Sequence, residues 1–176
     1  MPFRWFIALF CESVCAVSVV FAGSAAAQNL NTELLGQYPG DIDAILLDGK
    51  TMYVGQGHFF VVLDISNPAA IKPVSSCPFP GGGTVRSMAI VGKTVYAASA
   101  QDISGMSGGF CMFNVTNPAL PTVLGSYTLS QDIRGIGVYG AIVCLAGVGG
   151  IQFVDMTVPS APVLRGQFNS ACEIRG

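Results

Sequence analysis

Apolar residues recur along this chain in short runs of about five or six, and glycine, Asn-Pro or Asp-Gly separates one run from the next. Val, Ile, Tyr and Phe are frequent in these runs, and none of them combines a 3.6-residue period with helix-capping residues. Short β-branched and aromatic runs between turn residues are typical of strands. The pattern therefore predicts an all-β chain after the N-terminal segment.

The runs are organised in a unit that occurs three times. Each unit holds four runs, and the third run ends in Asp or Asn, an aliphatic residue or Met, Ser or Thr, one further residue and Pro. The units span about residues 41–79, 84–127 and 132–168. Four strands repeated about every 41 residues, the spacing from Arg134 to Arg175, predict β-propeller-type blades. In such a fold, each four-stranded antiparallel sheet is covered on both faces by its neighbours.

Two of the units carry extra residues, which are expected in loops. Tyr96 lies 18 residues before Asn114, against 11 between the equivalent residues of the first unit, so seven residues are inserted in the second unit. This inserted loop, near residues 101–109, is rich in Gly and Ser, and we expect it to be an exposed contact loop.

In the first unit, the two extra residues are predicted before the fourth strand. The spacing from the turn to the next proline is nine residues there, from Asp64 to Pro73, against seven in the second unit. Phe79 is accordingly assigned to the aromatic position that Tyr127 and Phe168 hold in the other two fourth strands.

The third-run motif is preceded by Gly-x-x-x-Tyr and followed by Leu-Gly-x-Tyr or Leu-x-Gly-x-Phe, and it stands at residues 62–68, 112–118 and 153–159. The combined pattern resembles the LVIVD repeat over about residues 30–176. The resemblance implies an exported or cell-surface β-propeller of the bacterial and archaeal kind, and it implies no particular activity. Asn114 in place of Asp, Val158 in place of Asn and Cys144 in place of Tyr depart from the pattern.

Partial units flank the complete ones. Residues 32–38 resemble a fourth strand with no unit before it, and residues 172–176 resemble the opening of a further unit. Propellers have roughly four to eight blades, so three complete units predict an incomplete propeller. We expect the chain either to be the N-terminal portion of a larger protein or to self-associate through its open blade edges.

Residues 1–27 have the layout of a secretory signal peptide. Arg4 supplies the positive flank, residues 5–20 form the apolar stretch, and residues 25–27 are alanines that suit cleavage before Gln28. We expect an exported protein, which is periplasmic, secreted or at the cell surface; an uncleaved anchor is the alternative. Beyond this segment no membrane span is expected, because no stretch of about 18 apolar residues is free of Gly, Pro and charge.

Charge excludes one class of partner. Charged residues make up 10% of the chain and the net charge is −2, whereas ordinary domains carry roughly 25% charge. The chain is too neutral to bind nucleic acid by neutralising phosphates. Its 51% hydrophobic content excludes disorder, and strands buried on both faces explain that value.

Few residues suit catalysis or metal binding. His58 is the only histidine, so neither triad chemistry nor a multi-histidine metal site is expected, and we assign no catalytic residue, metal or cofactor. The acidic residue that ends each third run is expected to accept hydrogen bonds from the backbone of the following turn. After cleavage four cysteines remain, which either form disulfides in one of three pairings or act as small buried hydrophobes. They are Cys77, Cys111, Cys144 and Cys172.

The strongest candidate for a binding site is a set of polar residues at the starts of the first strands. Pairs at positions i and i+2 share a face of a strand, so an acid and an arginine so placed can meet. In a propeller these positions would surround one mouth of the central channel, where they suit an anionic small molecule, or a cation near the first two acids. The candidate ligand-binding residues are Asp41, Asp43, Arg86, Asp132, Arg134 and Arg175. The alternative is that the pairs act as latches between blades.

These observations predict an exported module for binding or surface interaction, with no catalysis of its own. Its ligand, a protein or a small molecule, is not identified by the sequence. The alternative is the N-terminal part of a propeller enzyme of hydrolase or lactonase type, whose active-site residues lie in further blades.

Overall fold

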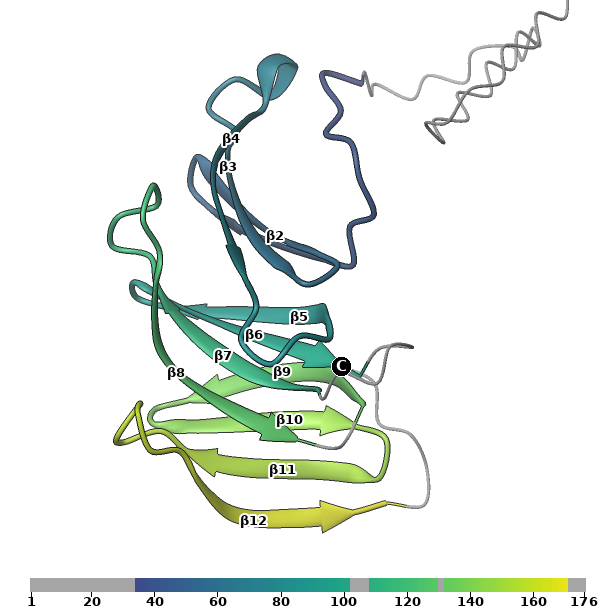
Figure 1. Ribbon diagram of the computed structural model, residues 1–176, viewed down its shortest axis with the longest axis vertical. Coiled ribbons are helices and arrows are strands. Elements are labelled where there is room, and N and C mark those ends of the chain that lie inside the picture. Colours follow the sequence, from purple (N-terminus) through teal and green to yellow (C-terminus); the bar gives the residue numbers. More distant parts are fainter. Residues whose placement is uncertain (1–33, 102–107, 130–131, 171–176) are drawn as a thin grey trace, which may run out of the picture. The chain divides into compact units, whose positions relative to one another are not determined.

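Strands make up nearly all the regular structure of residues 34–101, 108–129 and 132–170, which the computed structural model describes (Figure 1). They form three antiparallel sheets of four strands each. Sheet 1 contains β1 (Ala44–Asp48), β2 (Thr51–Gln56), β3 (Phe59–Asp64) and β4 (Lys72–Pro78), with the short 3-10 helix η1 (Pro68–Ala70) before β4. Sheet 2 contains β5 (Thr84–Val91), β6 (Thr94–Ala100), β7 (Gly108–Asn114) and β8 (Thr122–Leu129). Sheet 3 contains β9 (Ile133–Tyr139), β10 (Ile142–Gly147), β11 (Gly150–Asp155) and β12 (Val163–Asn169).

In each sheet the strands lie side by side in chain order, and every neighbouring pair is antiparallel. This confirms the prediction of an all-β, propeller-type chain built from four-stranded units. The three sheets do not close into a ring. In the described part of the chain, no helix has the length and apolar character of a membrane span.

The pairing of third and fourth strands is the same in all three sheets, and it corrects one assignment. The turn residue that ends each third strand pairs with the residue eight positions on, as Asp64 pairs with Lys72 and Asn114 with Thr122. The prediction that the two extra residues precede β4 was therefore wrong. They lie after β4 instead, because Cys77, and not Phe79, occupies the position of Tyr127.

Phe79 lies in the loop from β4 to β5, which the neighbouring hairpin holds in place. The Phe79 N–H donates to the carbonyl oxygen of His58 at 2.7 Å, and the Val85 N–H donates to that of Gly57 at 3.1 Å. Residues 81–83 are glycines with φ of 86°, 76° and 77°, a left-handed conformation that glycine adopts without strain. The extra loop residues thus return the chain to sheet 2 and bring Phe79 into the core.

Each sheet has two apolar faces. We call the face toward the preceding sheet the leading face and the face toward the following sheet the trailing face. The trailing face of sheet 1, which includes Tyr53, Phe60 and Val62, packs on the leading face of sheet 2, which includes Val95 and Phe113. The trailing face of sheet 2 packs in the same way on the leading face of sheet 3. Sheet 2 is therefore covered on both faces, as the continuous apolar runs predict.

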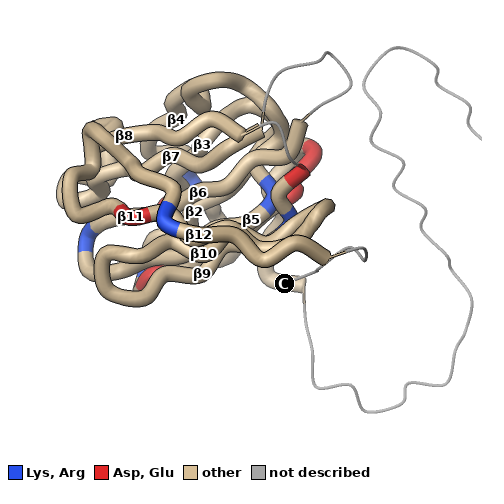
Figure 2. The backbone as a smooth tube through the Cα atoms, turned by 90° about the horizontal axis from the view of Figure 1, so that it is seen from below, with Lys and Arg blue, Asp and Glu red and all other residues tan. Residues whose placement is uncertain are grey.

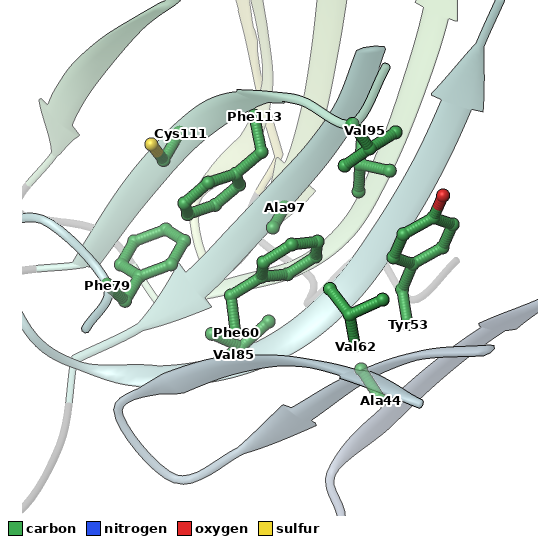
Figure 3. Close-up of a cluster of buried hydrophobic side chains, with 11 residues drawn as sticks. Ala44, Tyr53, Phe60, Val62, Phe79, Val85, Val95, Ala97, Cys111 and Phe113 are labelled. Carbon is green, nitrogen blue, oxygen red and sulfur yellow. The ribbon is translucent and has the colours of Figure 1, made fainter. Parts of the chain in front are cut away.

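An aromatic column forms the centre of the joint between sheets 1 and 2 (Figure 3). The rings of Phe60 and Phe113 stack with centroids 4.3 Å apart and planes within 6°. Tyr53 stacks on Phe60 at 5.7 Å, and Phe79 approaches Phe113 at 6.2 Å. Each such ring removes a large apolar area from water, so this column contributes strongly to joining the two sheets.

A second contact between consecutive sheets joins the fourth strand of one sheet to the turn after the third strand of the next. The Ser75 hydroxyl of β4 donates to the Pro118 carbonyl oxygen at 2.7 Å. At the equivalent position of β8, Gly125 lies so close to the Pro159 carbonyl oxygen that a Cβ atom would overlap it. Gly36, in the segment before sheet 1, lies in the same way against the Pro68 carbonyl oxygen.

This contact explains the glycine of the Leu-Gly-x-Tyr motif and generates a prediction. Because the obstructing atoms at Gly125 are backbone, Gly125→Ala should lower the free energy of unfolding by about 1–3 kcal/mol. Urea denaturation measures the change. Ser126→Ala, at an exposed position of the same strand, is the control and should change stability by less than about 0.5 kcal/mol. Equal effects of the two substitutions would contradict the close contact.

Candidate functional site

β-Bulges at the starts of the first strands present the candidate residues. In β5, Val85 and Ser87 pair with consecutive residues of β6, which leaves Arg86 as the extra residue of the bulge. In β9, Ile133 and Gly135 pair in the same way with β10, which leaves Arg134 extra. A bulge bends its strand and re-aims the extra side chain, and bulges are over-represented beside functional sites.

Asp43 holds the corresponding position in sheet 1. It directly precedes β1, and its N–H donates to the Gly55 carbonyl oxygen at 3.0 Å. Asp43 before β1, Arg86 in β5 and Arg134 in β9 occupy equivalent positions in three consecutive sheets, and β5 contacts both β1 and β9. Figure 2 shows acidic and basic segments at the end of the module beside β5, and others at the opposite end. We call these three residues the bulge row.

One ion pair stands within the predicted set. The Asp132 carboxylate oxygen Oδ2 accepts from Arg134 Nη2 at 2.6 Å and from Nε at 3.0 Å. Both side chains are about one-third exposed. The acid and the arginine at positions i and i+2 therefore meet, with Asp132 directly before β9 and Arg134 at its bulge. The ion pair therefore orients the Arg134 guanidinium beside the start of β9.

The structure places the other predicted residues with different results. Asp41 and Asp43 are exposed in the segment before β1, and Arg86 is exposed on β5. Arg175 lies outside the described residues, so its predicted role stays a prediction. The inserted loop also falls mostly outside them, between β6 and β7.

Serine hydroxyls, which the sequence reasoning did not single out, link consecutive sheets. The Ser87 Oγ of β5 accepts from the Ile136 N–H of β9 at 3.2 Å, and Ser75 makes the contact to Pro118 described above. Ser87 directly follows the bulge residue of β5, and Ser75 occupies the position in β4 that the motif glycine Gly125 holds in β8. Their equivalent positions become clear when the units are aligned by strand pairing. Alignment by the spacing from the prolines does not reveal them.

The turn after each third strand has the structure predicted for it. Oδ1 of Asp64, Asn114 and Asp155 accepts from the backbone N–H two residues on, at 2.8, 2.9 and 2.8 Å. The bond from the Ser66 N–H lowers the pKa of Asp64. Bonds from the side chain and backbone of Thr157, followed by Arg165, lower the pKa of Asp155 to about 2. These acids therefore serve the fold.

The lowered pKa of Asp155 makes the stability of the fold depend on pH in the acid range. A carboxyl whose pKa is lower in the folded than in the unfolded chain stabilises the fold above its ordinary value, 3.8. This contribution is lost as the pH falls from there to about 2. We expect Asp155→Asn, which keeps the accepting oxygen as Asn114 does, to lose less stability over this interval. Urea denaturation at a series of pH values measures this, and parallel curves for variant and wild type would contradict it.

The cysteines and the histidine have structural surroundings. Cys77, Cys111 and Cys144 are free thiols, and Cys172 lies outside the described residues. Cys111 is buried in the joint between sheets 1 and 2 (Figure 3). Burial, followed by the neighbouring Cys77, raises the pKa of its thiol to about 12, so it is unreactive. His58 Nδ1 lies 3.1 Å from the Gly83 carbonyl oxygen, in the contact that holds the β4–β5 loop.

Among residues 34–101, 108–129 and 132–170, no group of three or more His, Cys, Asp and Glu side chains is placed to hold a metal ion. At the starts of the first strands, the fold places the charged groups of the bulge row near Asp132. Guanidinium groups there can bind carboxylate or phosphate oxygens through paired N–H donors.

Comparison with protein families identifies the repeats. The LVIVD repeat family matches residues 39–78 and 131–170, which contain sheets 1 and 3. The chain therefore contains LVIVD repeats, as the motif predicts. Sheet 2, which carries the seven-residue insertion and Asn114, lies outside the matched residues and has the same strand order and pairing.

Among solved structures, one similarity supports the fold, and the fold alone. The chain is similar to the computationally designed Ika4 protein, with 15% identity and a TM-score of 0.62 over 82% of this chain and 84% of that one. It also matches the N-terminal domain of Nup159, with 12% identity and a TM-score of 0.44 over 74% of this chain and 31% of that one. No curated protein matches the sequence.

Proposed function

We propose that the chain is an exported, non-catalytic module that binds an anionic small molecule at the bulge row. The observation that carries the proposal is the pair of bulges that present Arg86 and Arg134 from equivalent positions of neighbouring sheets. A bulge interrupts strand pairing at the cost of ladder hydrogen bonds, so its recurrence with an arginine at the extra position favours a functional use.

Two guanidinium groups on neighbouring first strands favour an anion with more than one acidic group. Asp132 already accepts two hydrogen bonds from Arg134, which holds that guanidinium in place and partly neutralises it. Arg86 is exposed on the adjacent first strand. Asp41 and Asp43, on the other side, repel an anion, so the ligand would lie over β5 and β9. A di- or tricarboxylate spans two guanidinium groups through charge-assisted hydrogen bonds.

Citrate is a suitable probe of this site. We expect isothermal titration calorimetry to show citrate binding that Arg86→Ala and Arg134→Ala each weaken about 10-fold or more, the effect of losing a charge-assisted hydrogen bond. Lys93→Ala is the matched control, because it removes the same charge at the β5–β6 turn, at the other end of β5. It should leave citrate binding unchanged.

Thermal unfolding of the same variants separates a binding role from a structural one. If the arginines bind ligand, both variants unfold near the wild-type temperature without citrate. If they instead latch the sheets, both variants unfold at a clearly lower temperature than the wild type. Citrate binding is then no weaker in these two variants than in Lys93→Ala. That second result would overturn the proposal.

Export is the second part of the proposal, and it is supported by the layout of residues 1–27. We expect a signal peptidase to release a chain that begins at Gln28, and Ala27→Arg to block the release by removing the small residue at the cleavage site. Intact-mass measurement of protein recovered outside the cytoplasm of a bacterial host tests both. Recovery of the wild type only as the full chain starting at Met1, in the membrane fraction, would show an anchor instead.

A further inference from the structure

The trailing face of sheet 3 exposes side chains that are covered in the same position of sheet 2. Phe153 is 38% exposed, whereas its equivalent Met112 is 1% exposed in the joint with sheet 3. Phe168 is 60% exposed, whereas its equivalent Tyr127 packs into that joint. Tyr139 adds a ring that is 86% exposed. Apart from its missing cover, this face is built like those that bind a following sheet.

The leading face of sheet 1 is open in the complementary way. Ile45 and Leu47 of β1 are each 64% exposed. At the equivalent positions of β5, Met88 and Ile90 pack against the joint formed with the preceding sheet. Sheet 1 thus presents part of the surface that sheets 2 and 3 use to receive a preceding sheet.

Residues 34–38 cover the outer part of this leading face in the manner of a fourth strand. Tyr38 packs on the cluster of Val54, Val61 and Leu63, and Gly36 lies against the Pro68 carbonyl oxygen as Gly125 lies against that of Pro159. The segment contains no strand and leaves Leu34 and Leu35 exposed. It is therefore held by few contacts.

Strand β12 carries the same three-residue sequence type at the same position. Residues 36–38 read Gly-Gln-Tyr and residues 166–168 read Gly-Gln-Phe. Around Gly166 a Cβ atom would meet nothing within 4 Å, so the place that a following Pro carbonyl takes at Gly125 is open here. One molecule thus exposes a trailing face on sheet 3 and a leading face on sheet 1, the two kinds of face that meet in each of its two internal joints.

We propose that two copies of this chain associate head to tail, with the trailing face of sheet 3 of one copy on the leading face of sheet 1 of the other. In this joint β12 displaces residues 34–38, so that Gly166 and Phe168 take the places of Gly36 and Tyr38. The apolar rings of sheet 3 then cover Ile45 and Leu47 of the partner.

Two such joints close a ring. The described residues of each copy contribute three sheets, and two copies give six, which lies within the range of roughly four to eight blades in closed propellers. A head-to-tail interface either closes a ring or grows into an open filament. The permitted blade number favours the two-membered ring.

Substitution of Gly166 tests the proposal without disturbing the single copy. Light scattering coupled to size-exclusion chromatography should give twice the chain mass for the wild type and the single-chain mass for Gly166→Val. A side chain at Gly166 has room within one copy but would overlap the partner's turn. Leu120→Ser, at a 69% exposed position in the turn after β7, is the control and should keep the double mass.

A variant of the other face distinguishes head-to-tail from face-to-face pairing. Ile45→Ser with Leu47→Ser should also give the single-chain mass, and mixing this double variant with Gly166→Val should restore a pair, because one intact joint remains between them. Single-chain mass for the wild type throughout a concentration series would overturn the proposal. So would a double mass that the Ile45/Leu47 variant retains, since the sheet 3 faces would then pair with each other.

Discussion

Burial of each sheet by the next is the interaction on which this structure depends. A four-stranded sheet with two apolar faces is unstable alone in water, and each face gains roughly 25 cal/mol for every Å² of apolar surface that a neighbour covers. Sheet 2 receives cover on both sides and contains the most completely buried strand, β7. The low charge of the chain follows from this arrangement, because a sheet that is covered on both faces leaves few side chains in water.

The sheets were predictable because the signals for them are local. Apolar runs, turn glycines and the Asp-x-Ser/Thr-x-Pro turn each act within a few residues, so four strands per unit and their order followed directly. Register was not predictable in sheet 1, since Cys77 stands where the other sheets have an aromatic ring. Phe79 satisfied the expected spacing two residues later, and only the pairing of β3 with β4 shows the difference.

The candidate site was predictable to a similar extent. The i, i+2 rule brought Asp132 and Arg134 together, and their contact confirms it. The bulges that single out Arg86 and Arg134 were not foreseen, because strands covered on both faces have no strict alternation that an extra residue would shift. The links through Ser75 and Ser87 were missed for another reason. Each depends on a backbone group of a neighbouring sheet, far away in the sequence.

The two internal joints differ in what fills them, and this has a consequence for how the module adjusts. Flat rings stacked within 6° join sheets 1 and 2, and tilting these sheets would separate rings that lie face to face. Met112 and Met156 lie in the joint between sheets 2 and 3, and methionine has three rotatable bonds that let it fill gaps of changing shape. Small changes of angle between sheets should therefore be absorbed at the second joint, while sheets 1 and 2 behave as a rigid pair.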